Sequence, residues 1–326
     1  MTKSMNLLAA AGTMALAALI LAPNAVAQGQ YPNKPIRMVL QFPAGGLVDV
    51  IARLLSQPLT QQLGQPIIVD NRPGADGAIA GENVVKSAPD GYTIFFATTG
   101  AIASIQALRK NPPYDSLVDF TPISMIGRFP FFVFAHPSLA SKNLAELIDY
   151  ARANPGKLNY GSGSVPSIIA TSQIAQLAKV QMQHIPYKGD PPLMLDLVSG
   201  RLHFAFASTA PGGQLAKEGK LRVLGTLGSR RNALFPDAPT TAESGFPQLK
   251  LVSWCAMFGP AKLPADIGER LAREFNTAIK RPEVKDALDK YGFELEGSTP
   301  QELTAYVREQ VAYWKQSVKE AGITPD

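Results

Sequence analysis

The segment Pro43-Ala44-Gly45-Gly46 is the first in this chain whose residue types and spacing could do chemistry. It separates an apolar run, Ile36–Phe42, from a stretch with apolar residues at helical spacing, Leu47–Leu63. Glycines at such a junction let backbone N–H groups approach a ligand, and a helix start carries partial positive charge. The segment therefore suits a carboxylate, although glycine between a strand and a helix more often only makes a turn. Asp49, one turn into the helix, could hold this turn by hydrogen bonding or could be a solvated acid.

Small polar residues recur where other predicted strands end. Thr98-Thr99-Gly100-Ala101 follows the apolar run Tyr92–Ala97, and the second half of the chain offers Gly161–Ser167 and Ala207–Thr209. Open α/β sheets bind ligands at the carboxyl ends of their strands. One such loop is commonplace, but several at comparable positions favour a binding pocket.

The chain has few of the residues that enzymes and metal sites use. Cys255 is the only cysteine, so no internal disulfide can form, and its apolar neighbours indicate a packing role. The histidines, His136, His184 and His203, are not spaced with a second metal ligand. The common hydrolase, phosphate-loop and metalloprotease motifs are absent, and no serine or cysteine has a recognisable base partner. We therefore expect no enzyme activity, no cofactor and no metal site.

The composition describes a well-buried globular protein with few charges. Hydrophobic residues make up 46% and charged residues 17% of the chain, which argues against disorder. The formal net charge is +5 and the pI is about 9.2. The 31 basic residues are scattered, without a dense run or an aromatic platform, so we do not expect nucleic-acid binding. A mildly positive field instead favours encounter with small anions.

The chain begins with the features of an export signal. Lys3 precedes an uncharged run, Leu7–Leu21, and Ala25-Val26-Ala27 places small residues where a signal peptidase cuts. The run is too short to span a bilayer comfortably, and no charge cluster follows it. We expect residues 1–27 to be removed near Ala27 and the mature chain to lie in the periplasm.

Strand-like and helix-like segments alternate along the mature chain, which is typical of an α/β fold with helices on both faces of its sheets. We expect strands at Ile36–Phe42, Pro66–Asp70, Tyr92–Ala97, Phe131–Ala135, Leu158–Tyr160, Met182–Ile185, Leu202–Ala207 and Leu221–Thr226. We expect helices at Val48–Leu63, Ala78–Ser87, Leu144–Ala153, Ile168–Leu177, Leu193–Val198 and Gly213–Glu218. The tail is helical, with segments at Ala265–Ile279, Glu283–Tyr291 and Pro300–Ala321, the last capped by Thr299.

Two consecutive α/β units without a long linker indicate two lobes facing a cleft. The turn-rich segments Asp115–Pro130 and Pro236–Gln248 are the best candidates for the crossings between them. We expect residues 28–130 and 250–326 to form lobe I, with residues 131–249 inserted as lobe II. Each lobe should contain a mostly parallel sheet flanked by helices, followed by the helical C-terminal tail.

An ordered set of motifs resembles one receptor family over essentially the whole mature chain. The set begins with Tyr31-Pro-x-Lys-Pro-Ile-Arg and Phe42-Pro-Ala-Gly-Gly-x-x-Asp49. It continues with Asn71-Arg-Pro-Gly74, Asp90-Gly-Tyr-Thr93, Pro155-Gly-Lys-Leu-Asn-Tyr160, His184-x-Pro-Tyr-Lys-Gly189, Gly219-Lys-Leu-Arg222 and Pro236-Asp-x-Pro-Thr240. These motifs resemble those of the periplasmic solute receptors of tripartite tricarboxylate transporters, known as the Bug family.

The resemblance implies a two-lobed, Venus-flytrap receptor that captures an organic carboxylate and passes it to the permease subunits of such a transporter, without catalysis. In this family the carboxylate typically sits on the first Pro-Ala-Gly-Gly loop. The resemblance therefore assigns ligand-binding roles in lobe I to Phe42, Pro43, Ala44, Gly45, Gly46, Leu47, Val48, Asp49, Thr98, Thr99, Gly100 and Ala101. In lobe II it assigns them to Ser162, Gly163, Ser164, Ser167, Ala207, Ser208 and Thr209. We expect a monomer.

Three residues depart from the family pattern and bear on the ligand. Leu47 and Val48 fill positions that are often small or polar, and Ile168 stands where a histidine is common. If these side chains line the pocket, they favour an aromatic acid such as terephthalate over citrate, aspartate or glutamate. If they point into the lobe cores, they say nothing about the ligand. The alternative function is a ligand-sensing receptor that docks on a membrane sensor kinase, because transport and signalling use the same closed surface.

Overall fold

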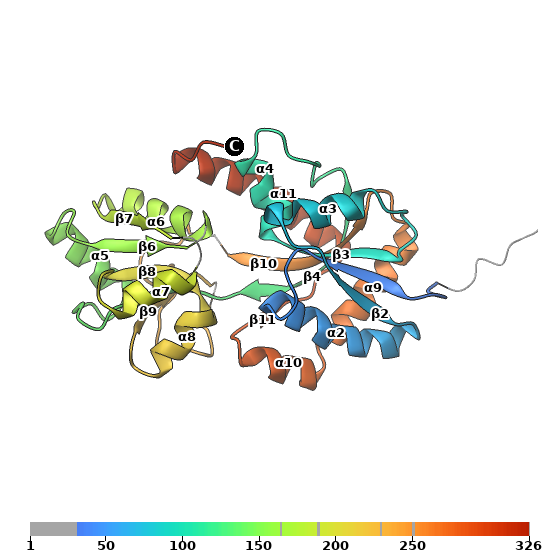
Figure 1. Ribbon diagram of the computed structural model, residues 1–326, viewed down its shortest axis with the longest axis horizontal. Coiled ribbons are helices and arrows are strands. Elements are labelled where there is room, and N and C mark those ends of the chain that lie inside the picture. The colour runs from blue at the N-terminus through green and yellow to red at the C-terminus, as the bar shows by residue number, and fades with distance from the viewer. Residues whose placement is uncertain (1–30, 164, 188–189, 229, 250–251, 326) are drawn as a thin grey trace, which may run out of the picture.

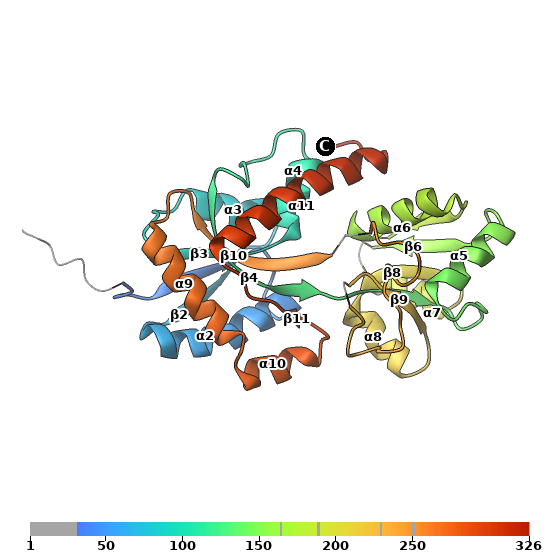
Figure 2. The ribbon, with the colours of Figure 1, turned by 180° about the vertical axis from the view of Figure 1, so that it is seen from behind.

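Two lobes lie side by side in the computed structural model, which describes residues 31–163, 165–187, 190–228, 230–249 and 252–325 (Figures 1 and 2). Each lobe has one β-sheet with helices on both faces, so the expected two-lobed α/β architecture is confirmed. The expected signal peptide, residues 1–27, lies outside the described residues. Within the described ranges, no helix is both long and apolar enough to cross a membrane.

Lobe I is built on a six-stranded sheet in the order β11-β4-β10-β3-β1-β2. Its strands are β1 (Ile36–Leu40), β2 (Ile67–Asn71), β3 (Thr93–Thr98), β4 (Phe120–Phe129), β10 (Ser253–Pro260) and β11 (Glu294–Leu295). β1 runs parallel to β2 and β3, whereas β10 is antiparallel to both of its neighbours and β11 is antiparallel to β4. The sheet is therefore mixed rather than mostly parallel. The reason is that β4 leads the chain toward lobe II while β10 leads it back.

Side chains of β1 alternate between two cores on the two faces of this sheet. Met38 and Leu40 pack on one face and Val39 on the other. The first face is covered by α2 (Leu47–Leu63), α9 (Ala265–Ala278) and α10 (Pro282–Asp289). The second is covered by α3 (Ala78–Val85), α4 (Ile105–Leu108) and α11 (Pro300–Glu320). Two short helical turns, η1 (Ala75–Gly77) and η2 (Gly100–Ser104), lie at the strand ends.

Lobe II is built on a five-stranded sheet in the order β7-β6-β8-β5-β9. Its strands are β5 (Phe131–Ala135), β6 (Asn159–Ser162), β7 (Gln183–Pro186), β8 (Phe204–Ser208) and β9 (Arg222–Thr226). Its helices are α5 (Leu144–Ala153) and α6 (Val165–Ala178) on one face and α7 (Asp190–Val198) and α8 (Thr209–Lys217) on the other. This sheet is also mixed, because β6 is parallel to β7 and β8 but β5 is antiparallel to β8 and β9.

The chain first crosses between the lobes as two nearly continuous strands rather than as a loop. β4 ends at Phe129 and β5 begins at Phe131, with only Pro130 between them. The expected turn-rich crossing at Asp115–Pro130 is therefore wrong for most of its length, because residues 120–129 form β4. Register shifts opposite β10 accommodate the turn-forming residues that this strand contains. These residues, Pro122 and Gly127 among them, concealed its strand pattern.

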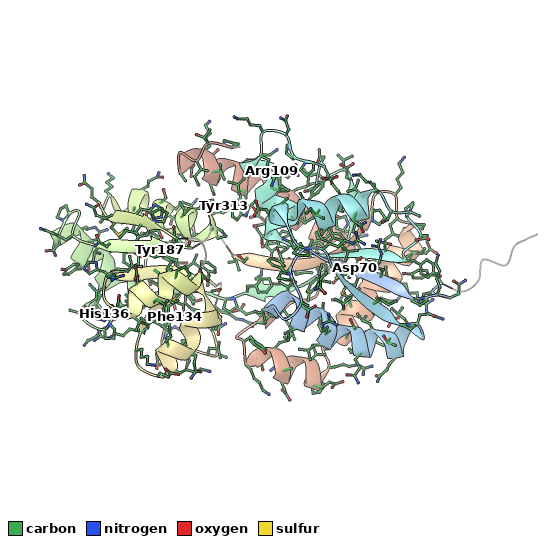
Figure 3. All side chains as sticks on the ribbon, in the orientation of Figure 1. Asp70, Arg109, Phe134, His136, Tyr187 and Tyr313 are labelled. Atoms are coloured by element: carbon green, nitrogen blue, oxygen red, sulfur yellow. The ribbon has the colours of Figure 1, made fainter. Side chains whose placement is uncertain are left out.

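A second interlobe contact lies between α11 and α6. Gln173 of α6 donates from Nε2 to Ser317 Oγ at 2.9 Å and accepts at Oε1 from the Tyr313 hydroxyl at 3.0 Å. Gln176 Nε2 donates to the Glu320 carbonyl oxygen at 2.9 Å. Tyr313 lies where α11 meets lobe II (Figure 3). The C-terminal helix therefore belongs to the core of lobe I but also supports lobe II.

The ends of two helices agree closely with the sequence patterns, whereas α6, α7 and α8 begin three or four residues earlier than expected. α5 has the predicted bounds, and α11 begins with a capping box in which Thr299 Oγ1 accepts from the Glu302 N–H at 3.2 Å while Glu302 accepts from the Thr299 N–H at 2.8 Å. Cys255 is fully buried in the lobe I core, as expected, and burial raises the pKa of its thiol. Local rules therefore sufficed where a helix carries its own start and stop signals.

Candidate functional site

The carboxyl ends of strands in the two lobes face each other across the lobe boundary. Ser253, the first residue of β10, pairs with Phe129 at the crossing, and Cys255 pairs with Thr98 at the end of β3. In lobe II, Phe131 at the crossing pairs with Ser208 at the end of β8. Because β1 is parallel to β3 and β6 is parallel to β8, the loops after all four strands lie on the facing edges. This is where α/β sheets usually bind ligands.

The Pro43–Gly46 turn after β1 is held by Asp49. The Asp49 carboxylate accepts from the Gly45 N–H at 3.0 Å, from Arg53 Nε at 2.9 Å and from Asn71 Nδ2 at 3.0 Å. Asn71 Nδ2 also donates to the Phe42 carbonyl oxygen at 3.0 Å. The side chain of Asp49 is buried, so it acts as an internal brace for the turn rather than as a solvated acid.

The electrostatics of Asp49 are compatible with a nearby anion. Hydrogen bonding to Arg53, opposed by burial and aided by Gly45 and Asn71, lowers the pKa of Asp49 from 3.8 to about 2. The carboxylate is therefore ionised at neutral pH, and its charge is paired with that of Arg53. The brace consequently fixes the turn without leaving an unpaired negative charge beside it.

The start of α2 leaves backbone donors at this edge. A helix has no internal partners for its first N–H groups, and Gly46 at the N-cap has no side chain to cap them. Residues 42–46 are exposed, whereas the Gly45 N–H is already used by Asp49. The donors that remain for a ligand therefore include the first turn of α2, beginning at Leu47, where the helix also carries partial positive charge.

Hydrogen bonds hold the Thr98–Ala101 loop beside the Pro43–Gly46 turn. Thr98 N–H donates to Gln41 Oε1 at 3.1 Å, and Thr99 Oγ1 accepts from the Trp254 N–H at 2.9 Å. Thr98, Thr99 and Ala101 are buried, so these side chains hold the loop and leave half-buried Gly100 nearest the surface. The Gln41 side chain lies against this loop, because a Cβ at Gly100 would come within 3.3 Å of its Nε2.

The predicted residues of lobe II gather at the ends of β6 and β8. Ser208 donates from Oγ to Asp190 Oδ2 at 2.9 Å, so its hydroxyl proton is directed at a carboxylate of the protein. Ser162 and Ser167 are buried, as is Ala207, while Gly163 is half-buried. The Thr209 hydroxyl is buried and has no hydrogen-bond partner in the part of the chain that the structure describes. Ser164 lies outside the described residues.

Ser162 has a base partner that the sequence did not reveal. Its Oγ lies 2.5 Å from His184 Nε2, and the His184 ring stacks on Tyr160 with centroids 5.0 Å apart. The expectation that no serine has a base partner is therefore wrong, because β6 and β7 pair in parallel and bring residues 22 positions apart together. Desolvation lowers the pKa of His184. Ser162 is only 1% exposed, which withholds its oxygen from a substrate in this structure.

The three apolar departures from the motif pattern have different surroundings. Val48 is 7% exposed and packs in the lobe I core. Its side chain therefore does not line the pocket and says nothing about the ligand. Leu47 is partly buried against that core at the start of α2, and Ile168 is half-buried on α6. Phe42 remains 36% exposed beside the turn. The apolar surface near the candidate site is thus smaller than the sequence suggested.

Comparison with known proteins identifies the family of this chain. Residues 51–323 match the model of the tripartite tricarboxylate transporter family receptor, TctC. The chain belongs to this family. Protein BugT of Bordetella pertussis is 33% identical over 322 residues, covering 97% of this chain and 98% of BugT.

Two solved structures that are similar to this chain contain ligands. The structure of R. palustris Rpa4515 with adipate has a TM-score of 0.76 and 31% identity, covering 91% of this chain and all of that one. MatC from Rhodopseudomonas palustris with bound malate has a TM-score of 0.70 and 28% identity, covering 88% of this chain and all of that one. This TctC-family chain therefore has the family and fold of solute-binding receptors rather than of enzymes.

The structure brings the predicted loops to two facing edges but also adds contacts that motif reasoning missed. Gln41, His184 and Asp190 each hold a predicted residue in place. Gln41 is a lone polar residue at the end of an apolar strand, which is a usable sequence signal. His184 opens one of the family motifs, but neither its contact nor that of Asp190 was signalled, since their partners, Ser162 and Ser208, are distant in sequence.

Proposed function

We propose that this TctC-family receptor captures an organic carboxylate between its two facing edges in the periplasm, after cleavage near Ala27. The observation that carries the proposal is the start of α2, where an internally braced turn precedes uncapped backbone N–H groups. Such a helix start binds anions without a charged side chain. The adipate and malate of the two relatives are carboxylates of the corresponding kind.

Binding would proceed by replacing the water around the carboxylate with donors that are already in place. The α2 amides of lobe I supply one set, and the buried Thr209 hydroxyl of lobe II offers a donor that lacks a partner within the described residues. Rotation of lobe II, residues 131–249, toward lobe I, residues 28–130 and 250–326, would then enclose the ligand. The closed form would deliver it, as a monomer, to the permease subunits of a tripartite tricarboxylate-type transporter.

The proposed ligand class is an aromatic carboxylate, with terephthalate as the test compound. Leu47 and Ile168, which are partly exposed near the edges, support this class together with exposed Phe42, whereas Val48 belongs to the core. A flat apolar body between two carboxylates would lie against these side chains. A hydroxyl buried there without a partner would cost about 1–3 kcal/mol, or roughly tenfold or more in affinity.

Calorimetry and thermal unfolding against a panel of acids test the proposal. The panel contains adipate, malate, citrate, benzoate and terephthalate. At least one acid should bind and be recovered unchanged, and at about 100 times Kd it should stabilise the fold by about 2.7 kcal/mol. Chemical conversion of a bound acid by pure protein, or failure of every carboxylate to bind, would contradict the receptor assignment.

Specificity and transport need separate measurements. Leu47→Ser should weaken terephthalate more than malate, with Leu117→Ser as a control, because Leu117 is an exposed leucine outside the candidate site. Equal affinity of the unmutated protein for citrate and terephthalate would overturn the aromatic assignment alone. Gene deletion should abolish uptake of the ligand; loss of gene induction with normal uptake would instead indicate a signalling receptor.

A further inference from the structure

We propose that contacts on the side of the crossing strands opposite the candidate site hold the lobes apart and thereby set the affinity of this receptor. We call these contacts the rear clamp. It consists of Arg230 and Asn232 of lobe II together with Gly292 and Glu294 of lobe I. The part of the proposal that concerns affinity rests on the proposed function, whereas the part that concerns lobe separation does not.

The position of the rear clamp follows from the order of strands in the two sheets. In lobe I, β3 and β1 lie on one side of the crossing strands β4 and β10, and β11 lies on the other. In lobe II, β8 and β6 lie on one side of β5, and β9 lies on the other. The candidate site is at the ends of β1, β3, β6 and β8. The clamp joins the loop after β9 to β11 and the turn before it, so the two sets of contacts lie on opposite sides of the crossing.

Asn232 makes the best-defined contact of the clamp. It is 3% exposed, and its Nδ2 donates to the Gly292 carbonyl oxygen of the other lobe at 2.9 Å. Its Oδ1 accepts from the Leu234 N–H at 3.0 Å, which shapes its own loop. The lobes approach closely here, because a Cβ at Gly292 would lie 2.5 Å from Leu234 Cδ1. This buried hydrogen bond therefore requires a particular separation of the two lobes.

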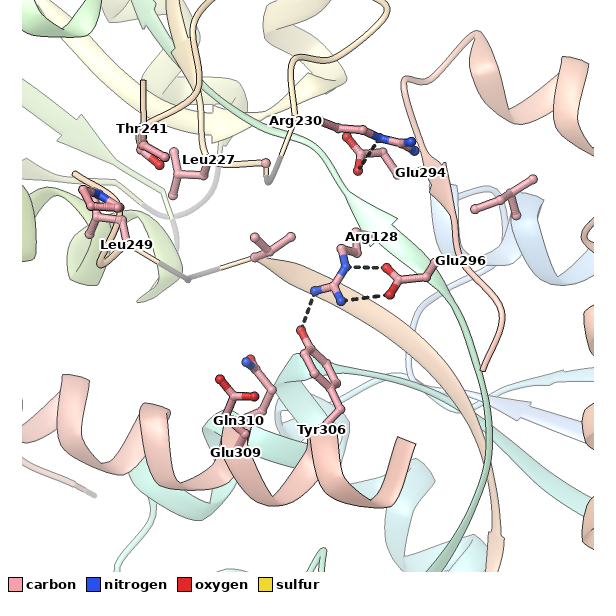
Figure 4. A pocket seen from close by; sticks show the side chains of 15 residues that line it. Arg128, Leu227, Arg230, Thr241, Leu249, Glu294, Glu296, Tyr306, Glu309 and Gln310 are labelled. Atoms are coloured by element: carbon pink, nitrogen blue, oxygen red, sulfur yellow. Dashed lines mark hydrogen bonds and ion pairs between the residues drawn. The ribbon is translucent and has the colours of Figure 1, made fainter. Parts of the chain in front are cut away.

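An ion pair and a cavity complete the rear face. Arg230 Nε lies 3.6 Å from Glu294 Oε2, with the Arg230 side chain largely exposed and that of Glu294 mostly buried. Beside this pair, a cavity of about 660 Å³ separates loops of lobe II from β11 and α11 of lobe I (Figure 4). Since this space is not filled by side chains, breaking the clamp exposes no packed core at the cavity itself. The contact between α11 and α6 still joins the lobes when the clamp is broken.

Rotation that closes the candidate site must open the rear face, because the crossing strands lie between them. Each clamp contact forms at the lobe separation of this structure and therefore stabilises this arrangement relative to a more closed one. A ligand that binds the closed form shows an apparent Kd equal to its intrinsic Kd divided by the fraction of closed protein. Weakening the clamp should raise that fraction and tighten binding, even though no clamp residue touches the ligand.

Asn232→Asp is the most selective test, because Asp retains the oxygen that accepts from Leu234 and loses the donor to Gly292. Its Kd for the tightest-binding acid of the panel should fall by about threefold to tenfold. Glu294→Gln should lower Kd less, since its partner is exposed. Arg231→Ala is the matched control: it removes a neighbouring arginine whose partner, Glu243, lies in the same lobe, and its Kd should not change.

Small-angle X-ray scattering of the ligand-free proteins tests lobe separation independently of any ligand. Asn232→Asp should have a smaller radius of gyration than the unmutated protein, and Arg231→Ala should not. If Asn232→Asp proves unstable in urea unfolding, the Arg230→Ala/Glu294→Gln double variant should show the same two changes. An unchanged radius of gyration, or weaker binding by folded clamp variants, would overturn the clamp. Failure of all acids to bind, with a reduced radius, would overturn the proposed function but not the clamp.

Discussion

Replacing Asp49 should weaken ligand binding while leaving the protein folded. Asp49→Ala removes the acceptor for Gly45, Arg53 and Asn71. Each lost hydrogen bond is worth about 0.5–1.5 kcal/mol, and the exposed Gly45 and Arg53 donors can bond to water instead. We expect a loss of about 2 kcal/mol in the free energy of unfolding, which is less than the 5–15 kcal/mol typical of a folded domain.

Asp49→Ala should weaken binding because the backbone of the Pro43–Gly46 turn becomes less ordered in the free protein. Fixing the backbone of one residue costs about 1–2 kcal/mol, so releasing even one residue of Pro43–Gly46 should raise Kd by about tenfold. Calorimetry with the tightest-binding acid measures Kd, and urea unfolding measures stability. Asp49→Asn should fall between the unmutated protein and Asp49→Ala, because the amide keeps one acceptor oxygen.

Direct repulsion between Asp49 and an anionic ligand is the competing explanation, and it predicts a change in Kd in the opposite direction. Under repulsion, both Asp49→Ala and Asp49→Asn would bind more tightly than the unmutated protein. Unchanged or tighter binding would therefore refute the brace. Glu82→Ala is the control, since Glu82 also pairs with a cation four residues along a helix but lies outside the facing loops; it should leave Kd unchanged.

Three further results are expected. Because the pKa of Asp49 is lowered from 3.8 to about 2, its stabilisation is present above about pH 4 and lost as pH falls toward 2; the difference in urea midpoint between the unmutated protein and Asp49→Ala should therefore be smaller at pH 2.5 than at pH 7. Thr99→Val keeps the shape but leaves the buried Trp254 N–H without its acceptor, and should lower the free energy of unfolding by about 1–3 kcal/mol in urea titrations. Thr299→Ala removes the cap of α11 and should cost about 1 kcal/mol, whereas Thr299→Ser should cost less.

Much of the local structure could be predicted because each signal lies within one segment. The helix from Leu47, the capped helix from Pro300 and the buried strand Phe131–Ala135 carry their own apolar period or end signals. The long strand β4 was missed because Pro122 and Gly127 break its pattern, and pairing with β10 and β11 stabilises it. Strand pairing is a property of two segments, so one segment's sequence does not contain it.

The candidate site divides in the same way. The sequence by itself determined the glycine turn, the helix start after it and the family motifs, since these depend on neighbouring residues. Only the tertiary structure decided that Asn71 joins Asp49 in holding the turn, that His184 meets Ser162 and that Val48 faces the core. It also decided that Asn232 reaches across to Gly292. The physical reason is that hydrogen-bond partners and burial are set by which strands pair and which lobes meet. Chain folding thereby joins Asn232 to Gly292 across 60 positions and Thr99 to Trp254 across 155 positions.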